Sequence, residues 1–360
     1  MSSAYRFTFM MSVLAVLWLL QTVIYLVTAN AYGYAFPHWP WLFLGVSVLF
    51  IFANALARMS TNFFVNLFYV GASIWLGVTF LFFSAAFFYQ VFRLAGGIKS
   101  TELLTACLGI AGIAAVYSLF NARHLTVKEF TVPIKNLEKP LRLVHLSDVH
   151  IGTVHQTKFL KRVVALTNEQ KPDLILMTGD LFDGSTPIDE SILSPINDFE
   201  APIFFSNGNH EEYEGLQKVA ETVSHLDMPL LANRVTTWNG IQIIGVDDQG
   251  SHPEGVSLKT ILNDMPIQSD KPSILMYHTP VEWDVARHFN IDLMLSGHTH
   301  NGQIFPFTLL VRLSFKYVKG LFEEGGKYLH VTPGTGTWGP PMRLGSQNQV
   351  TLLHLEPKAE

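Results

Sequence analysis

The first third of this chain has almost no charged side chains. Through residue 123, the only Asp, Glu, Lys or Arg residues are Arg6, Arg58, Arg93, Lys99, Glu102 and Arg123. The chain also lacks any basic run and carries a formal net charge of −5, which argues against a nucleic acid as its main partner. Its single cysteine, Cys107, excludes an intramolecular disulfide and leaves the redox compartment undetermined.

Four long apolar runs occupy this uncharged region, at about residues 8–29, 39–57, 64–92 and 103–121. Each is long enough for the roughly 20 helical residues that cross a bilayer, whereas a buried core helix would be shorter and would not recur four times. We therefore expect a four-helix transmembrane domain over residues 1–123, with the third run tilted or extending beyond the lipid. No charged residue falls well inside a run, which favours an anchor or lipid-access module over a transport path.

The side of the membrane depends on the Lys and Arg residues beside the helices. With both ends cytoplasmic, the inside carries Arg6, Arg58, Arg123, Lys128 and Lys135, and the outside carries Arg93 and Lys99. The small excess of Lys and Arg on the side of the chain ends favours a multi-pass protein of the cell (inner) membrane with a cytoplasmic C-terminal domain. Residues 29–31 read ANA, like a signal-peptidase site, but the preceding run is long for a signal peptide, so an uncleaved helix is favoured.

The pattern changes after residue 123. A linker and first strand over 124–140 lead into short β-rich runs separated by polar, helix-compatible segments. This alternation predicts an α/β domain over 141–360, with a largely buried sheet flanked by helices. The runs lie at residues 141–147, 173–179, 202–208, 241–246, 273–278 and 292–297, and further strands are expected at 328–332 and 350–355.

Five of these runs end in side chains that can bind a metal. They run into the motifs DVH, GD, GNH, YH and GHTH, and α/β sheets gather their ligands at the carboxyl ends of strands. A lone histidine is more often a core residue, and GD or GNH alone is ordinary turn chemistry, but five such ends in this order are improbable by chance. The candidate ligands are Asp148, His150, Asp180, Asn209, His278, His298 and His300.

Seven donors are too many for one tetrahedral zinc ion, but they fit two five- or six-coordinate ions that share a bridge, for which Asp180 is the natural residue. Carboxylate, amide and imidazole donors without thiolate suit Mn²⁺, Fe²⁺ or Zn²⁺ better than Ca²⁺. Two ions about 3.5–4 Å apart can activate a water and clamp phosphoryl oxygens for in-line attack. Glycines beside the ligands, Gly179, Gly208 and Gly297, let the backbone turn sharply there.

The order DVH, GDLFD, GNHE, YH and GHTH resembles the metallophosphoesterase (calcineurin-like phosphoesterase) superfamily over about residues 140–356. The motifs GHTHNGQ and PGTGTWGPPMRLG are similar to one branch, the bacterial membrane-associated phosphoesterases and the transmembrane protein with metallophosphoesterase domain. The resemblance implies a four-layer α-β-β-α sandwich and an enzyme that hydrolyses a phosphomonoester, phosphodiester or pyrophosphate.

The resemblance also divides the ligands between two ions: one takes Asp148, His150, Asp180 and His300, and the other takes Asp180, Asn209, His278 and His298. His210 resembles the family's non-ligand histidine, which stabilises or protonates the leaving oxygen. Asp183 resembles the carboxylate that orients this histidine, with a helix N-cap as the alternative. Many relatives have Asp where this chain has Glu211, a change expected to alter a flank and not a ligand.

Three further features leave alternatives open. Residues 304–322 are apolar and aromatic with interleaved cations, which fits either a lip against the bilayer or a core strand and hairpin; the cations are Arg312, Lys316 and Lys319. Arg343 fits a bidentate phosphate contact in a substrate site or a structural salt bridge. Asp247 and Asp248 follow a strand and either line the cleft or form a turn.

A membrane-tethered phosphoesterase with an apolar lip points to a phosphate-containing lipid as its substrate. A phospholipid or a lipid-linked nucleotide fits, and the sharper hypothesis, taken from the resemblance, is the pyrophosphate of UDP-2,3-diacylglucosamine. A tethered phosphodiesterase for soluble nucleotides needs the same metals without the lip. A non-enzymatic receptor or transporter is disfavoured because it would tolerate loss of the ligands. No oligomeric state is predicted.

Overall fold

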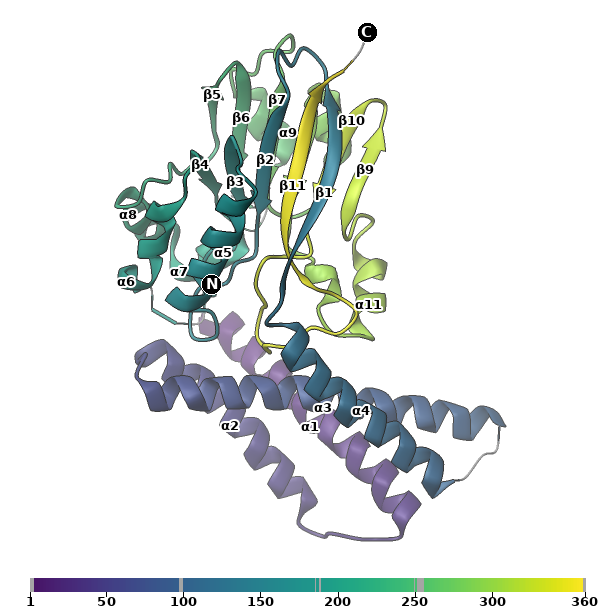
Figure 1. The fold of residues 1–360 in the computed structure, drawn as a ribbon. Helices are drawn as coiled ribbons and strands as arrows, with labels where there is room; N and C mark the ends of the chain where they lie inside the picture. The colour runs from purple at the N-terminus through teal and green to yellow at the C-terminus, as the bar shows by residue number, and fades with distance from the viewer. Residues whose placement is uncertain are drawn as a thin grey trace.

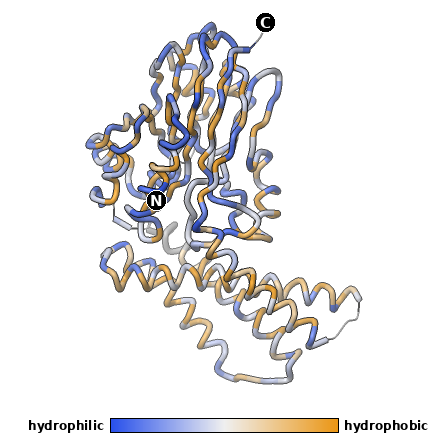
Figure 2. Tube along the Cα trace, in the orientation of Figure 1, coloured by the Kyte–Doolittle hydropathy of each residue, from blue (hydrophilic) through white to orange (hydrophobic). Residues whose placement is uncertain are grey.

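The computed structural model describes residues 3–96, 100–184, 186–187, 189–248, 250 and 256–358. Four long helices come first: α1 (Ser3–Tyr32), α2 (Trp39–Met59), α3 (Phe63–Gly96) and α4 (Thr101–Asn121). All four are long and apolar enough to cross a membrane, as predicted, and Figure 2 shows apolar residues along them. Lys99, which entered the prediction of orientation, lies outside the described residues.

The remainder of the chain forms two mixed sheets. The first has the order β1-β11-β2-β3-β4 and the second has the order β5-β6-β7-β8-β10-β9. The strands of the first sheet are β1 (Leu125–Ile134), β11 (Asn348–Pro357), β2 (Leu141–Leu146), β3 (Leu174–Thr178) and β4 (Ile203–Ser206). The strands of the second are β5 (Arg234–Trp238), β6 (Ile241–Val246), β7 (Ser273–Tyr277), β8 (Leu293–Ser296), β10 (Lys327–Val331) and β9 (Gly320–Glu324).

Helices cover the outer faces of both sheets, which confirms the predicted α-β-β-α sandwich (Figure 1). One apolar core lies between the two sheets. A second lies between the first sheet and its helices, and a third lies between the second sheet and its helices. In α5, for example, the residues that face the core recur at helical spacing: they are Leu160, Val163, Val164 and Thr167. The helices are α5 (Thr157–Glu169), α6 (Glu190–Leu193), α7 (Asn209–Glu214), α8 (Leu216–Ser224), α9 (Leu258–Asn263) and α10 (Trp283–His288).

Strand direction places the ligand-bearing strand ends next to the membrane helices. Strand β1 begins four residues after α4 ends and runs away from the helices, and β11 runs parallel to it. Strand β2 is antiparallel to β11, and β3 and β4 are parallel to β2. The carboxyl ends of β2, β3 and β4 therefore point back toward α3 and α4 (Figure 1).

The middle of α3 and the end of α4 pack against loops of the α/β domain. A Cβ atom at Gly77 would collide with the Met342 sulfur, and the rings of Phe80 and Phe307 lie 6.4 Å apart edge to face. The backbone N–H of Arg343 donates to the carbonyl of Ser118 at 2.9 Å. A helix of 34 residues is about 51 Å long, well beyond about 30 Å of hydrocarbon. Since α3 touches the α/β domain at its midpoint, it must tilt strongly or leave the lipid, as the sequence predicts.

Candidate metal centre

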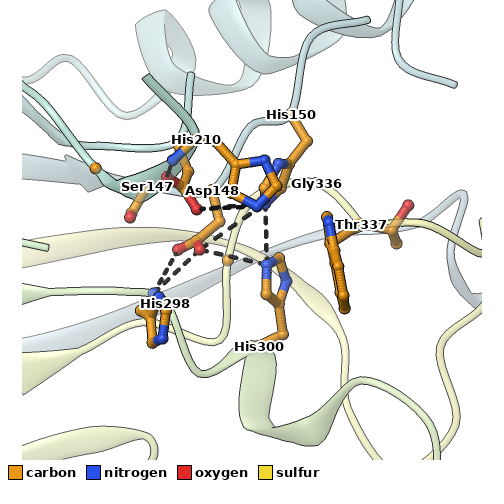
Figure 3. Close-up of polar contacts among 12 residues, drawn as sticks. Ser147, Asp148, His150, His210, His298, His300, Gly336 and Thr337 are labelled. Carbon is orange, nitrogen blue, oxygen red and sulfur yellow. Dashed lines mark hydrogen bonds and ion pairs between the residues drawn. The ribbon is translucent and has the colours of Figure 1, made fainter. Parts of the chain in front are cut away.

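The seven candidate ligands meet at one edge of the sandwich, as the sequence predicts they should. The imidazole Nε2 of His300 lies 3.3 Å from Asp148 Oδ1, and that of His278 lies 3.1 Å from Asp180 Oδ2. On the outer side, His298 Nδ1 lies 2.9 Å from Asn209 Oδ1. Figure 3 shows side chains from different strand ends gathered around the carboxylate of Asp148. Among the described residues three overlapping groups have metal-ligand spacing: Asp148, His150 and His300; Asp180, His278 and His298; and His150, Asp180 and His210.

The arrangement of lone pairs indicates that this cluster binds cations. His278 Nδ1 lies 2.8 Å from the carbonyl oxygen of Thr178, so in the neutral ring Nδ1 carries the proton and Nε2 carries a lone pair. Among the described residues that nitrogen has no hydrogen-bond partner, yet it faces the carboxylate of Asp180. The Nε2 atoms of His150 and His300 lie 3.0 Å apart, and that of His300 also lies 3.3 Å from Asp148 Oδ1. Buried acceptors that face acceptors are stabilised by a shared cation, so the residues present fit a metal site.

The backbone at the site is held in a sparsely populated conformation. Five of the seven ligands have φ between 47° and 67°, in the left-handed region that costs a non-glycine residue about 1–3 kcal/mol each; they are Asp148, His150, Asp180, His298 and His300. A Cβ atom at Gly297 would collide with the carboxylate of Asp148 and with Ser147. The turns are therefore shaped to bring the ligands together, at a cost that the surrounding fold must offset.

His210 lies beside the cluster, with its ring 4.7 Å from that of His150. Burial opposes its charged form, but the carboxylates of Asp180 and Asp183 outweigh this effect and raise the pKa of His210. The sequence predicts that the carboxylate of Asp183 orients His210. In the structure the backbone of Asp183 also does so, because His210 Nδ1 donates to its carbonyl oxygen at 2.6 Å. The N-cap alternative for Asp183 is wrong, since the next helix, α6, is capped by Asp189.

Comparison with known proteins agrees with this geometry. Residues 141–302 match the model of the calcineurin-like phosphoesterase family. An uncharacterized metallophosphoesterase of Campylobacter jejuni is 34% identical over 69% of this chain and 68% of its own length. The chain belongs to the calcineurin-like metallophosphoesterase family. Enzymes of this family are metal-dependent phosphoester hydrolases.

Other relatives of this phosphoesterase include both membrane and phosphodiesterase proteins. The transmembrane protein with metallophosphoesterase domain of Danio rerio is 32% identical over 73% of this chain and 64% of its own length. Phosphodiesterase YaeI of Escherichia coli is 30% identical over 61% of this chain and 84% of its own length. The chain spans 64% to 68% of the length of four curated relatives, which include the Campylobacter jejuni and Danio rerio proteins. These likenesses support the assignment of a membrane-associated phosphoesterase.

Glu211, which the sequence placed only on a flank, connects two of the ligand turns. Its buried carboxylate accepts the backbone N–H groups of Asp180 at 2.8 Å, Gly208 at 2.7 Å and Phe182 at 3.1 Å. Burial is the main cause that raises its pKa, to about 7. The carboxylate therefore fixes the turn of Asp180 against the turn that carries Asn209. The signal in the sequence was its place directly after GNH at the start of α7.

Arg343 is fully buried, which disagrees with the tentative substrate-binding role. Its guanidinium donates to the backbone carbonyls of His300 at 3.0 Å and Gly336 at 2.5 Å, and to Asn348 Oδ1 at 2.7 Å. These acceptors are neutral, so the salt-bridge alternative does not describe it either, and burial lowers its pKa to about 9. We assign Arg343 a positioning role behind the candidate metal ligand His300.

Hydrogen bonds continue from Arg343 to the membrane helix α4. The side-chain amide of Asn121 donates to the carbonyl of Arg343 at 2.9 Å and to that of Ser346 at 3.0 Å. Asn348 donates to the carbonyl of Ala122 at 2.7 Å. The end of α4, the loop at 343–348 and the GHTH turn are therefore one bonded unit, which connects the candidate metal site directly to the apolar helices.

Substitution Arg343→Lys tests this positioning role. Lysine keeps the charge but cannot donate in several fixed directions, so the turn of His300 should lose part of its support. We expect metal affinity to fall about 10- to 100-fold, as for other residues that orient ligands, while kcat at saturating metal falls less. Titration of the metal-free protein with Mn²⁺ measures this effect. Arg234→Lys, on the exposed edge strand β5, is the matched control, and equal metal affinity in both variants would refute the role.

Other predicted residues lie in supporting positions. Asp248 accepts both the backbone N–H and the hydroxyl of Thr279, next to the ligand His278. Asp247 accepts from Asn207 at 2.7 Å and from Asn233 at 3.0 Å, so both carboxylates hold loops of the site. No pattern in the sequence singles out His145, which is buried and forms hydrogen bonds with His330 at 2.8 Å and Thr178 at 2.7 Å behind the cluster.

Proposed function

We propose that this chain is a membrane-bound phosphoesterase with two divalent ions, which hydrolyses a phosphoester or pyrophosphate bond of a lipid. One observation carries the proposal: the metal site lies at the end of the sandwich that faces the apolar helices (Figure 1). Loops next to its candidate ligands, at 304–307 and 340–344, pack on the middle of α3 and on α4. A domain that was only tethered would not need its catalytic loops there.

In this proposal one ion is held by Asp148, His150, Asp180 and His300, and the other by Asp180, Asn209, His278 and His298. When bound, two such ions neutralise phosphoryl charge and activate the attacking water. Asp180 is the shared ligand because its carboxylate lies 3.9 Å from His150 Nε2 and 3.1 Å from His278 Nε2. The oxygen and nitrogen donors of the seven candidate ligands suit Mn²⁺, Fe²⁺ or Zn²⁺.

His210 is proposed to donate the proton to the leaving oxygen. The carboxylates of Asp180 and Asp183 favour its charged form, and its Nδ1 is occupied by the carbonyl of Asp183, so Nε2 is the nitrogen that faces the site. The exposed ring of Trp338 lies 6.2 Å from the ring of His210. An apolar surface beside the proton donor suits a leaving group with an attached lipid.

The alternative is a tethered phosphodiesterase for soluble nucleotides, which needs the same metals. Three substrates distinguish the two: phosphatidyl lipids in vesicles, UDP-2,3-diacylglucosamine, and soluble cyclic and dinucleotides, each assayed with the purified full chain and Mn²⁺. We expect turnover of at least one lipid substrate, with soluble nucleotides cleaved much more slowly. Rapid turnover of soluble nucleotides without turnover of any lipid would favour the alternative.

We also propose that the catalytic domain is cytoplasmic and that the protein resides in the cell (inner) membrane. The support is the excess of Lys and Arg on the side of the chain ends, including Arg58 and Arg123. Protease treatment of intact cells should leave the catalytic domain uncut until the membrane is permeabilised. Cutting in intact cells would reverse the orientation.

A further inference from the structure

We infer that the catalytic domain itself enters the bilayer through helix α11 (Phe307–Ser314), so that lipid covers a face of the phosphoesterase beside its metal site. This lipid face consists of Phe305, Phe307, Leu309, Leu310 and Leu313, all of which are exposed. The occupant is a lipid surface with anionic headgroups. The membrane contact does not depend on the identity of the substrate, whereas its consequence for substrate entry rests on the proposed function.

Helix α11 has the reverse of the usual polarity for a helix on a water-soluble domain. Its buried side consists of Thr308 and Val311, whereas three leucines point outward and Leu313 is 84% exposed. A helix in water would place its leucines inward and its threonine outward. Contiguous exposed apolar surface of this kind marks a site of contact with a membrane or a partner.

Continuity with the membrane helices selects the bilayer as that contact. Phe307, at the start of α11, packs edge to face on Phe80, which lies within the candidate membrane span of α3. Ile304, three residues earlier, belongs to a buried cluster with Leu81 of α3 and Ala115 of α4. Figure 1 shows α11 next to the α3–α4 pair. The lipid face therefore begins where the surfaces of α3 and α4 are themselves apolar.

Cations accompany the lipid face. Arg312 is exposed on α11, and Lys316 and Lys319 follow within a few residues and are also exposed. No Asp or Glu occurs between positions 293 and 322, so this stretch of the sequence carries a net positive charge. An apolar face with Lys and Arg at its margin is the pattern of a helix that lies in the interface of an anionic membrane.

The segment after α11 reaches the metal ligands. The ring of Phe315 lies 5.5 Å from that of His298, and the hydroxyl of Thr299 donates to the carbonyl of Val318 at 2.6 Å. The segment that continues the chain directly after α11 therefore contacts the GHTH turn. A phosphate group at the membrane surface would meet the cations and then the metal site without leaving the lipid.

A fluorescent probe tests the membrane contact independently of catalysis. The single native cysteine is replaced (Cys107→Ser), and a polarity-sensitive fluorophore is attached through Leu313→Cys. The matched control is Thr237→Cys on β5, an exposed position on the edge strand of the second sheet. The full chain is reconstituted in vesicles of phosphatidylcholine and phosphatidylglycerol. Quenching is then measured with lipid-attached nitroxides and with iodide present on both sides.

We expect the probe at position 313 to be quenched by the lipid nitroxides and protected several-fold from iodide, and the probe at 237 to show the opposite. Equal exposure of both probes to iodide would overturn the inference. Protection from iodide without quenching by lipid would also overturn it, because a second copy or another protein would then cover the face.

The consequence for substrate entry is tested by the double variant Leu310→Ser, Leu313→Ser. We expect hydrolysis of a vesicle lipid substrate to fall at least tenfold, while turnover of bis(p-nitrophenyl) phosphate stays within a factor of two. If the probe lies in lipid but the double variant hydrolyses both substrates like the wild type, α11 is only an anchor and the proposed route of substrate entry is refuted. If the wild-type protein hydrolyses no lipid, the proposed function fails while the probe result still stands.

Discussion

Substitution Asp180→Asn should abolish hydrolysis of even an artificial phosphodiester while the protein stays folded in the membrane. Asp180 lies within reach of ligands proposed for both ions, since its Oδ2 is 3.9 Å from His150 Nε2 and 3.1 Å from His278 Nε2. An amide loses the negative charge that two divalent ions share. Each 1.36 kcal/mol of lost transition-state stabilisation lowers the rate tenfold, so a loss of several kcal/mol reduces kcat about 10³-fold or more.

The control for this variant is Asp264→Asn, because Asp264 is an exposed carboxylate at the end of α9. Both variants should elute like the wild type in detergent and melt at similar temperatures in the absence of metal. Turnover of bis(p-nitrophenyl) phosphate is the measurement. Undiminished turnover by Asp180→Asn would refute its role as the bridge.

Substitution Gly297→Ala should have a comparable effect without removing any ligand. The added methyl group would overlap the carboxylate of Asp148 and the side chain of Ser147, and both are fully buried and cannot move away. Asp148 Oδ1 also accepts the backbone N–H of His298 at 3.0 Å, so displacement of the carboxylate disturbs both sides of the cluster. We expect metal affinity to fall at least about 100-fold, at the upper end for changes around ligands.

Calorimetric titration of the metal-free protein with Mn²⁺ measures this loss. Gly240→Ala is not a suitable control, because its φ of 81° would itself strain an alanine. Gly109→Ala, within α4, has open space around the added atom and is the matched substitution. Normal metal binding by Gly297→Ala would show that the carboxylate of Asp148 is not fixed in the way the structure indicates.

The ligands could be predicted from the sequence because the strands before them are buried. Strands β3, β7 and β8 are buried at every position, so they appear as continuous apolar runs with clear ends. Each end is followed at once by a turn with a ligand, as at Asp180 and His298. Edge strands β5 and β9 are half-exposed, and their mixed composition gives no such signal.

The supporting residues could not be predicted because their partners are distant in the chain. Asn121 and Arg343 are separated by 222 positions, and no local pattern indicates their hydrogen bond. Glu211 bonds the backbone of Asp180, 31 positions earlier, and a backbone acceptor leaves no trace in side-chain identities. Residues 304–322 stayed ambiguous because their apolar side chains suit either a core or a lipid face. Only tertiary packing shows that Thr308 points inward and Leu313 outward.

Anomalous diffraction from crystals of the full chain grown with Mn²⁺ tests the central claim most directly. The account predicts two strong peaks per chain, about 3.5–4 Å apart, with the carboxylate of Asp180 between them. One peak should lie near Asp148 and His300, and the other near Asn209 and His298. A single peak, or peaks outside this group of side chains, would contradict the account.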